Sequence, residues 1–258
     1  MGIIKERMSN LEALRLLCML MVLNLHSFHG WTNGSGFWQA FDFFRESSSI
    51  CAVDCFVLIS GYFGINWKFK SFYNLVFQIF FYSIAIYVFV SSIGLLEWNN
   101  RDFFKCFGCL YNDSWGFVTG YIILYFCAPI LNVFANHSSS RELLYYLIVF
   151  FIATNFICVS LHSDPAFMFF LLYLLGRLLR KIRIERYTPS IKFWGMAYLI
   201  ITVIIFVIMY FLLVKVLEIT DSDRVCSFPI GFIGYSYTSP LVILQAISLF
   251  LIFFTIKF

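Results

Sequence analysis

Charged residues are scarce in this sequence. Lys, Arg, Asp and Glu supply only 12% of its 258 residues, while hydrophobic residues supply 61%. Soluble domains are about 25% charged and about 45–50% apolar, so this composition excludes a soluble globular core. The sequence also lacks an internal repeat, a low-complexity stretch and a soluble appendage. We therefore expect a single integral membrane domain that covers residues 1–258.

What the sequence has instead is a series of apolar blocks. A helix needs about 20 predominantly apolar residues to cross roughly 30 Å of hydrocarbon. Eight blocks approach or reach that length, at 13–28, 50–65, 72–96, 116–135, 143–161, 166–179, 193–217 and 241–256. They predict an all-α fold, a polytopic transmembrane bundle of about eight helices. The chain stops two residues after the last block, which is compatible with C-terminal truncation.

The first block lacks the marks of a cleaved signal peptide. Lys5 and Arg7 precede it, as in a signal peptide, but Arg15 lies inside the apolar run and His26 lies near its end. No small-x-small cleavage signal follows before Trp31. We therefore expect this block to remain as the first membrane helix.

Positive charge is unevenly shared between alternate connections. With the N-terminus inside, twelve of the 18 Lys and Arg residues fall in cytoplasmic segments and five in outer segments, and Arg15 lies within the first helix. Cytoplasmic loops hold the excess of Lys and Arg, so we expect a multi-pass protein of the cell (inner or plasma) membrane with a cytoplasmic N-terminus. The basic run at 177–192 would face anionic lipid headgroups, which explains the net charge of +4 without a nucleic-acid partner.

The eight cysteines lack the pattern of a metal site. Most lie inside apolar blocks, where a thiol behaves as a small hydrophobe. Cys106 and Cys109 lie in an outer connection and are close enough in sequence to bridge in an oxidising compartment. A zinc site would need a second pair or histidines beside them, so we expect no bound metal.

The first helix carries ionisable residues at membrane depth, where such residues mark functional sites by default. Arg15 and His26 are eleven positions apart, which places them within about 20° of the same direction and about 16 Å apart along the helix. Glu12 lies on the same stripe and can pair with Arg15. Histidine suits general base catalysis near neutral pH, and arginine suits phosphate. In the alternative interpretation Glu12 and Arg15 snorkel at the interface, and headgroups or water satisfy His26.

The second block contains Asp54 and, later, Ser60 and Gly61. An aspartate in an apolar block needs a partner or water, so Asp54 is a candidate functional residue. In the alternative interpretation Asp54 lies at the outer interface beside the polar residues 47–49, and Ser60 and Gly61 permit close helix packing.

Aromatic residues mark the fourth block, with Trp115 just before it, Tyr121 and Tyr125 within it, and Pro129 further along. An aromatic belt and a proline kink would explain these residues without any function.

Together these motifs resemble the membrane acyltransferase-3 family of multi-pass transferases. Residues 10–15 are similar to the acidic-x-x-Arg start of the family's first helix, and Arg15 with His26 reproduces its arrangement of an Arg, ten residues and a His. Residues 54–61 are similar to the family's Asp-hydrophobic-Phe-hydrophobic-Ser-Gly segment. The aromatic fourth block is similar to the family's fourth helix, and the later blocks match only as apolar segments.

The resemblance implies transfer of an acyl group, most often acetyl, from an acyl-coenzyme A donor to a sugar hydroxyl. The acceptor would be a surface polysaccharide or its lipid-linked precursor. No cofactor is expected to be bound permanently, and acyl-CoA (acetyl-CoA) would be a co-substrate. His26 would act as general base on the acceptor hydroxyl or relay the acyl group, with Arg15 and Glu12 in the same catalytic set.

The resemblance also implies a substrate-binding set, namely Asp54, Ser60, Gly61, Lys68, Lys70, Trp115, Tyr121 and Tyr125. The phosphates of the donor would approach from the cytoplasm, where Arg15, Lys68 and Lys70 supply cations. The chain departs from the family here, because Lys68 and Lys70 stand where members tend to have arginines. A lysine binds phosphate as a point charge and not as a bidentate fork.

Two other functions remain open at this stage. Intramembrane Arg, His and Asp residues also build the pathways of secondary transporters and flippases, here for a glycolipid or a small solute. Paired repeats with broken helices would support that function, and none is visible in the sequence. A truncated, inactive protein with a structural or partner-binding role is the third possibility.

Overall fold

The computed structural model describes residues 9–27, 36–107, 116–153, 165–184, 190–216 and 236–256. Within these ranges every regular element is a helix, so the predicted all-α fold is confirmed. The chain divides into two compact units, one made of Met1–Phe63 with Leu175–Phe258 and the other of Gly64–Leu174.

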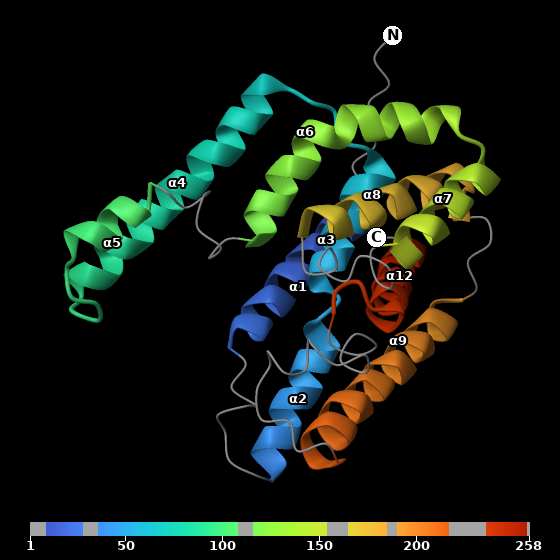
Figure 1. The fold of residues 1–258 in the computed structure, drawn as a ribbon. Coiled ribbons are helices and arrows are strands. Elements are labelled where there is room, and N and C mark those ends of the chain that lie inside the picture. Colours follow the sequence, from blue (N-terminus) through green and yellow to red (C-terminus); the bar gives the residue numbers. More distant parts are fainter. Residues whose placement is uncertain are drawn as a thin grey trace. The chain divides into compact units, whose positions relative to one another are not determined.

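The first unit holds the N-terminal and C-terminal helices. They are α1 (Ser9–His26), α2 (Phe37–Ser49), α3 (Ala52–Phe63), α9 (Ile191–Phe206), the π-helix η5 (Val207–Val216) and α12 (Pro240–Thr255) (Figure 1). The second unit holds α4 (Phe69–Ser92), α5 (Asn100–Lys105), α6 (Gly116–His137) and α7 (Ser140–Ile152). The remaining helix, α8 (Pro165–Lys181), begins in the second unit and ends in the first.

Each of the eight predicted apolar blocks contains a helix, and the seventh contains α9 together with η5. In the described part of the chain, three helical segments are long and apolar enough to cross a membrane alone, namely Phe69–Ser92, Phe117–His137 and Ile191–Leu212. The shorter α12 is apolar as well. These lengths agree with the prediction of a membrane-spanning bundle.

Residues 37–49 lie between the first two predicted apolar blocks, where no helix was expected, and they form α2. This helix packs against α1 and α9 and buries a face that is mostly polar, with Asp42, Phe43, Glu46, Ser47 and Ser49. Its serines and charged residues are typical of a loop when the sequence is read alone. The partners that accept this polar face come from distant parts of the chain, so the local pattern does not reveal the helix.

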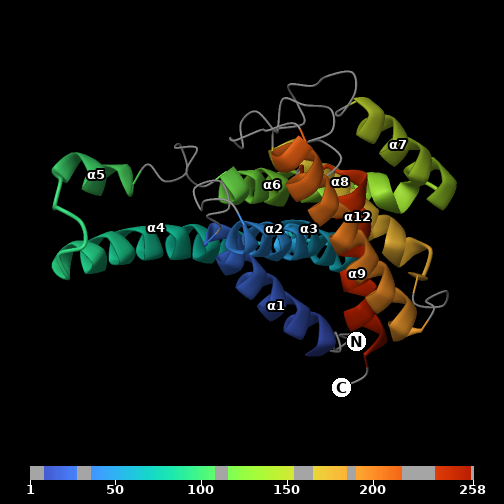
Figure 2. The ribbon, with the colours of Figure 1, turned by 90° about the horizontal axis from the view of Figure 1, so that it is seen from below.

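A short turn joins α2 to α3. Backbone hydrogen bonds continue through it, because Ile50 N donates to Glu46 O (2.9 Å) and Cys55 N donates to Cys51 O (3.0 Å). Figure 2 shows the two helices following one another along the same line. At 1.5 Å per residue, the path over residues 37–63 is about 40 Å long.

Asp54 lies in the first turn of α3, directly after the turn that joins α2 to α3. Its depth in the membrane stays a prediction.

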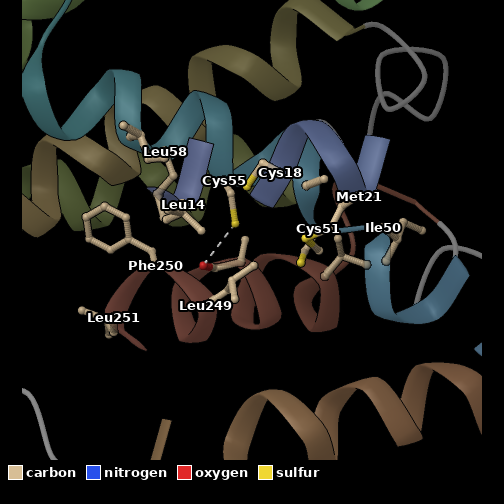
Figure 3. Close-up of a cluster of buried hydrophobic side chains, with 14 of the residues drawn as sticks. Leu14, Cys18, Met21, Ile50, Cys51, Cys55, Leu58, Leu249, Phe250 and Leu251 are labelled. Atoms are coloured by element: carbon tan, nitrogen blue, oxygen red, sulfur yellow. Dashed lines mark hydrogen bonds between the residues drawn. The ribbon is translucent and has the colours of Figure 1, made fainter. Parts of the chain in front are cut away.

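Apolar side chains fill the centre of the first unit (Figure 3). On α1 the buried residues follow helical spacing and form one face, with Leu11, Leu14, Cys18 and Met21. They belong to the same buried cluster as residues of α3 and α12, among them Cys55, Leu58, Leu249 and Phe250. α1 and α12 are also linked at one end, where Asn10 Nδ2 donates to Phe253 O (2.8 Å). The polar stripe therefore lies on a helix whose buried face is fixed by packing.

Candidate functional site

The stripe on α1 begins with an ion pair. Arg15 Nη1 lies 2.8 Å from Glu12 Oε1, so the pairing predicted from their spacing is present. Both side chains are about half-buried. The Arg15 guanidinium also lies over the ring of Phe63, 6.0 Å from its centroid, a distance at which a cation is attracted to an aromatic face. Arg15 is thereby fixed beside the last residue of α3.

His26 is the last residue of α1, and its side chain is exposed. The neighbouring turn is tied to α2, because Asn24 Nδ2 donates to Ser49 Oγ (2.6 Å) and Arg45 Nη1 donates to Ser27 Oγ (2.7 Å). These bonds fix the end of α1, so the imidazole stands on an anchored backbone while its own ring is accessible.

Asp54 is a fully buried ionisable group of α3. It is 0% exposed, and neither carboxylate oxygen has a hydrogen-bond partner among the described residues. An unpaired carboxyl group in a dry interior is costly, and such a group at membrane depth is a functional candidate.

Tyr237 lies just before α12 and responds electrostatically to Asp54. Tyr237 is 38% exposed. Desolvation of the covered part of its side chain, followed by the negative charges of Asp54 and Glu46, raises the pKa of Tyr237 to about 12. The phenol therefore keeps its proton at neutral pH and remains a hydrogen-bond donor. Sequence reasoning missed this residue because it is distant in sequence from the second block.

Gly61 lies where α8 crosses α3. A Cβ atom added at Gly176 of α8 would lie 2.5 Å from Leu58 O, 2.7 Å from Tyr62 N and 2.9 Å from Gly61 C. The two helices therefore touch backbone to backbone, as the packing interpretation of Ser60 and Gly61 requires. Ser60 Oγ donates to Phe56 O (2.9 Å) within its own helix. The substrate-binding role of Ser60 and Gly61 stays a prediction.

One turn after Gly176, Arg180 reaches the end of α3. Its Nη1 atom donates to Phe63 O (2.9 Å) and to Tyr62 O (3.2 Å), carbonyl groups that a helix leaves unpaired at its C-terminus. Arg180 belongs to the basic run that we assigned to lipid headgroups, and this contact gives it a second role. The sequence marks this contact only by spacing, because a small residue, Gly176, precedes Arg180 by four positions.

Gln245 is a second residue that sequence reasoning missed. It is fully buried in α12, and its Nε2 donates to Thr202 Oγ1 (2.7 Å) and to Ser47 O (3.0 Å). These bonds join α12 to α9 and to α2. A glutamine inside an apolar block is the only signal in the sequence.

Lys68 and Lys70 lie in the second unit, at the start of α4. Both side chains are exposed, and neither has an acidic partner among the described residues. Tyr125 contacts this region through its hydroxyl, which accepts from Lys68 N (3.0 Å) and donates to Lys68 O (3.1 Å). Arg15 belongs to the first unit, so a donor site that it shares with the two lysines stays a prediction.

The structure describes only one of the other two predicted aromatic residues. Tyr121 stacks on Phe117 with ring centroids 6.2 Å apart, and Trp115 lies outside the described residues. Cys109 lies outside them too, so its bridge to Cys106 stays a prediction. No cluster of three or more His, Cys, Asp or Glu side chains suited to a metal occurs in the described ranges.

Comparison with known proteins identifies the family. No curated protein and no solved structure matches the chain. The model of the acyltransferase-3 family, described as an acyltransferase domain, matches residues 8–257 and so covers nearly the whole sequence. The match includes α1 with its Arg15 and His26, the α2–α3 path with Asp54, and every later helix. The chain therefore belongs to the acyltransferase-3 family and is a membrane acyltransferase.

Proposed function

We propose that this acyltransferase moves an acyl group, usually acetyl, from acyl-CoA to a sugar hydroxyl. The acceptor is a surface polysaccharide or its lipid-linked precursor, and the enzyme lies in the cell membrane with its N-terminus in the cytoplasm. The observation that carries the proposal is the stripe on α1, where Arg15 is held by Glu12 and Phe63 and an accessible His26 ends the same helix.

Arg15, Lys68 and Lys70 bind the phosphates of the donor. Arg15 uses one nitrogen for Glu12, and a guanidinium has five N–H donors, so others are left for a phosphate. Lys68 and Lys70 supply two further charges from the exposed start of α4. Charge-assisted bonds of this kind are stronger than neutral ones, which supports these cations as ligands of a polyanionic donor.

His26 performs the chemistry about 16 Å further along α1. The long thioester arm of the donor extends from the phosphates to this histidine. The imidazole takes the proton of the sugar hydroxyl while the hydroxyl oxygen bonds to the thioester carbonyl carbon. The carbon–sulfur bond then breaks, and the departing CoA thiolate takes the proton from the imidazolium. The products are a sugar ester and free CoA, and His26 is neutral again.

A relay through His26 gives the same products in two steps. In that route the imidazole nitrogen attacks the carbonyl carbon and releases CoA, and the sugar hydroxyl then attacks the acyl-imidazole. Trapping of acyl-His26 when donor is supplied without acceptor distinguishes the relay from direct transfer.

We assign Asp54 to acceptor binding, which requires the interior to open around its fully buried carboxyl group. Its two oxygens lack partners in the described part of the protein, and a sugar presents several hydroxyl donors. Tyr121 and Trp115 belong to the same proposed substrate-binding set, together with Ser60 and Gly61 at the contact between α3 and α8.

The test compares His26→Ala with the parent and with His137→Ala in intact cells. His137 ends α6 and bonds through Nδ1 to its own helix at Val133 O (2.9 Å), so it is a matched control at a helix end. We expect alkali-released acetate from the polysaccharide to fall by about 10²-fold or more in His26→Ala and to stay unchanged in His137→Ala, at equal membrane abundance. Undiminished acylation in His26→Ala would overturn the catalytic role. Movement of glycolipid across the membrane without acylation by the parent would instead favour a flippase.

A further inference from the structure

The segment that leads into α4 is unusual because side chains, not a helix or sheet, satisfy its backbone. Residues 64–68 have no regular secondary structure, and Gly64 has a left-handed φ of 77°. Lys68 is the N-cap of α4 with an extended backbone, and no side chain caps the helix there. This segment carries Lys68 directly and sets the start of the turn that carries Lys70.

Three side chains from the second unit bind this segment. The hydroxyl of Tyr173 accepts from Ile65 N (2.9 Å) and donates to Asn132 Oδ1 (2.8 Å). Asn132 Nδ2 in turn donates to Ile65 O (2.9 Å), which closes a ring of three hydrogen bonds. Tyr125 binds both backbone groups of Lys68 in the same way. Each phenol thus uses its single proton and one lone pair, as its chemistry permits.

These bonds lie in a dry environment. Tyr173 is 0% exposed and Tyr125 is 7% exposed, so neither phenol can exchange its protein partners for water. A hydrogen bond that is lost in such a place leaves an unsatisfied group, which costs more than the bond itself is worth. The segment is therefore held in one conformation by α6 and α8.

Simple stabilisation of a connection would explain the bonds but not the charges beside them. Lys68 and Lys70 place two ammonium groups at the N-terminus of a 24-residue helix, where the helix dipole disfavours cations. The bonding network uses only backbone atoms of Lys68, and both lysine side chains remain exposed. An anionic ligand would relieve the repulsion between these charges and the helix dipole.

We propose that Tyr125, Asn132 and Tyr173 form a clamp that fixes residues 64–68 and so positions Lys68 and Lys70 for the phosphates of acyl-CoA. They are positioning residues, because their own atoms contact the backbone and not the donor. The inference rests on the proposed function. It also assigns Tyr125 a role that differs from direct substrate binding.

The test measures steady-state kinetics with two donors, acyl-CoA and acyl-pantetheine, which shares the thioester but has no phosphates. The variants are Tyr125→Phe and Tyr173→Phe, and the control is Tyr82→Phe. Tyr82 is an exposed α4 tyrosine whose hydroxyl has no hydrogen bond among the described residues. We expect the clamp variants to raise KM for acyl-CoA about two- to tenfold, as expected for the loss of one or two hydrogen bonds. KM for acyl-pantetheine, and kcat with either donor, should stay within about twofold of the parent.

A second measurement keeps the test decisive if a clamp variant is less stable. In a Lys68→Gln, Lys70→Gln background, Tyr125→Phe should change KM for acyl-CoA no further, because a clamp that acts through the lysines has nothing left to position. Equal losses with both donors, or full additivity in that background, would show that the clamp is only structural. Absence of any transfer from acyl-CoA by the parent would remove the proposed function itself, and with it the clamp. Normal parental activity with unchanged KM in the clamp variants would overturn the clamp alone.

Discussion

Gly176→Ala should destabilise the protein because α8 and α3 touch through their backbones. The added methyl group would lie 2.5 Å from Leu58 O and 2.7 Å from Tyr62 N, closer than such atoms approach. Both obstacles are backbone atoms of a helix, so neither can rotate away as a flexible side chain would. Overpacking of this kind costs about 1–3 kcal/mol, and helices must separate to relieve it.

An opposing effect has to be subtracted. Alanine is favoured over glycine inside a helix by about 1 kcal/mol, so the net loss is up to about 2 kcal/mol. The matched control is Gly195→Ala in α9, where an added Cβ would meet no atom within 4 Å. There the propensity gain stands alone, and we expect an increase in stability of up to about 1 kcal/mol.

The two variants should therefore change the free energy of unfolding in opposite directions. The assay is unfolding of the detergent-solubilised proteins, followed under reversible conditions. Gly176→Ala should also loosen Arg180 from the end of α3, since Arg180 follows one turn later. If Gly176→Ala stabilised the protein as much as Gly195→Ala, the close crossing of α8 over α3 would be wrong.

Three further predictions concern charge. Asp54→Asn keeps the shape of the side chain but removes its ability to carry a charge, so acyl transfer should fall while the free energy of unfolding stays equal or rises. A loss of stability would mean that Asp54 has a partner. Lys68→Gln and Lys70→Gln should each raise KM for acyl-CoA. Lys192 is an exposed lysine at the start of α9, and Lys192→Gln should leave this KM unchanged. Equal effects of all three substitutions would indicate a general surface charge effect. Tyr237 should ionise near pH 12 in an ultraviolet titration against Tyr237→Phe. The pKa of Tyr237 in the folded protein lies above the unfolded value of about 10. Its stabilising contribution is therefore complete below about pH 10 and is lost as the pH rises towards about 12. A titration midpoint near pH 10 for Tyr237 would contradict the raised pKa.

The sequence predicts helices well where one face is uniformly apolar. The eight apolar blocks depend on length and hydrophobicity alone, and the Glu12–Arg15 pair depends on helical spacing alone, so both could be predicted. α2 could not, since its buried face is polar and is recognisable only with its partners on α1 and α9.

The same limit applies to the site. The hydroxyl of Tyr125 is bonded to the backbone of a residue 57 positions away, and nothing local marks that contact. Gly176 and Arg180 likewise depend on where α8 crosses α3. Sequence patterns therefore predict which residues carry chemistry, while contacts between distant segments identify those that hold them in place.

The most direct test of the central claim uses the purified protein in lipid vesicles, with acyl-CoA labelled in the acyl group and a sugar acceptor. We predict that free CoA thiol and an alkali-labile sugar ester appear in equal amounts, and that both are lost in His26→Ala but retained in His137→Ala. Ester formation that persists in His26→Ala, or CoA release without any sugar ester from the parent, would contradict the account.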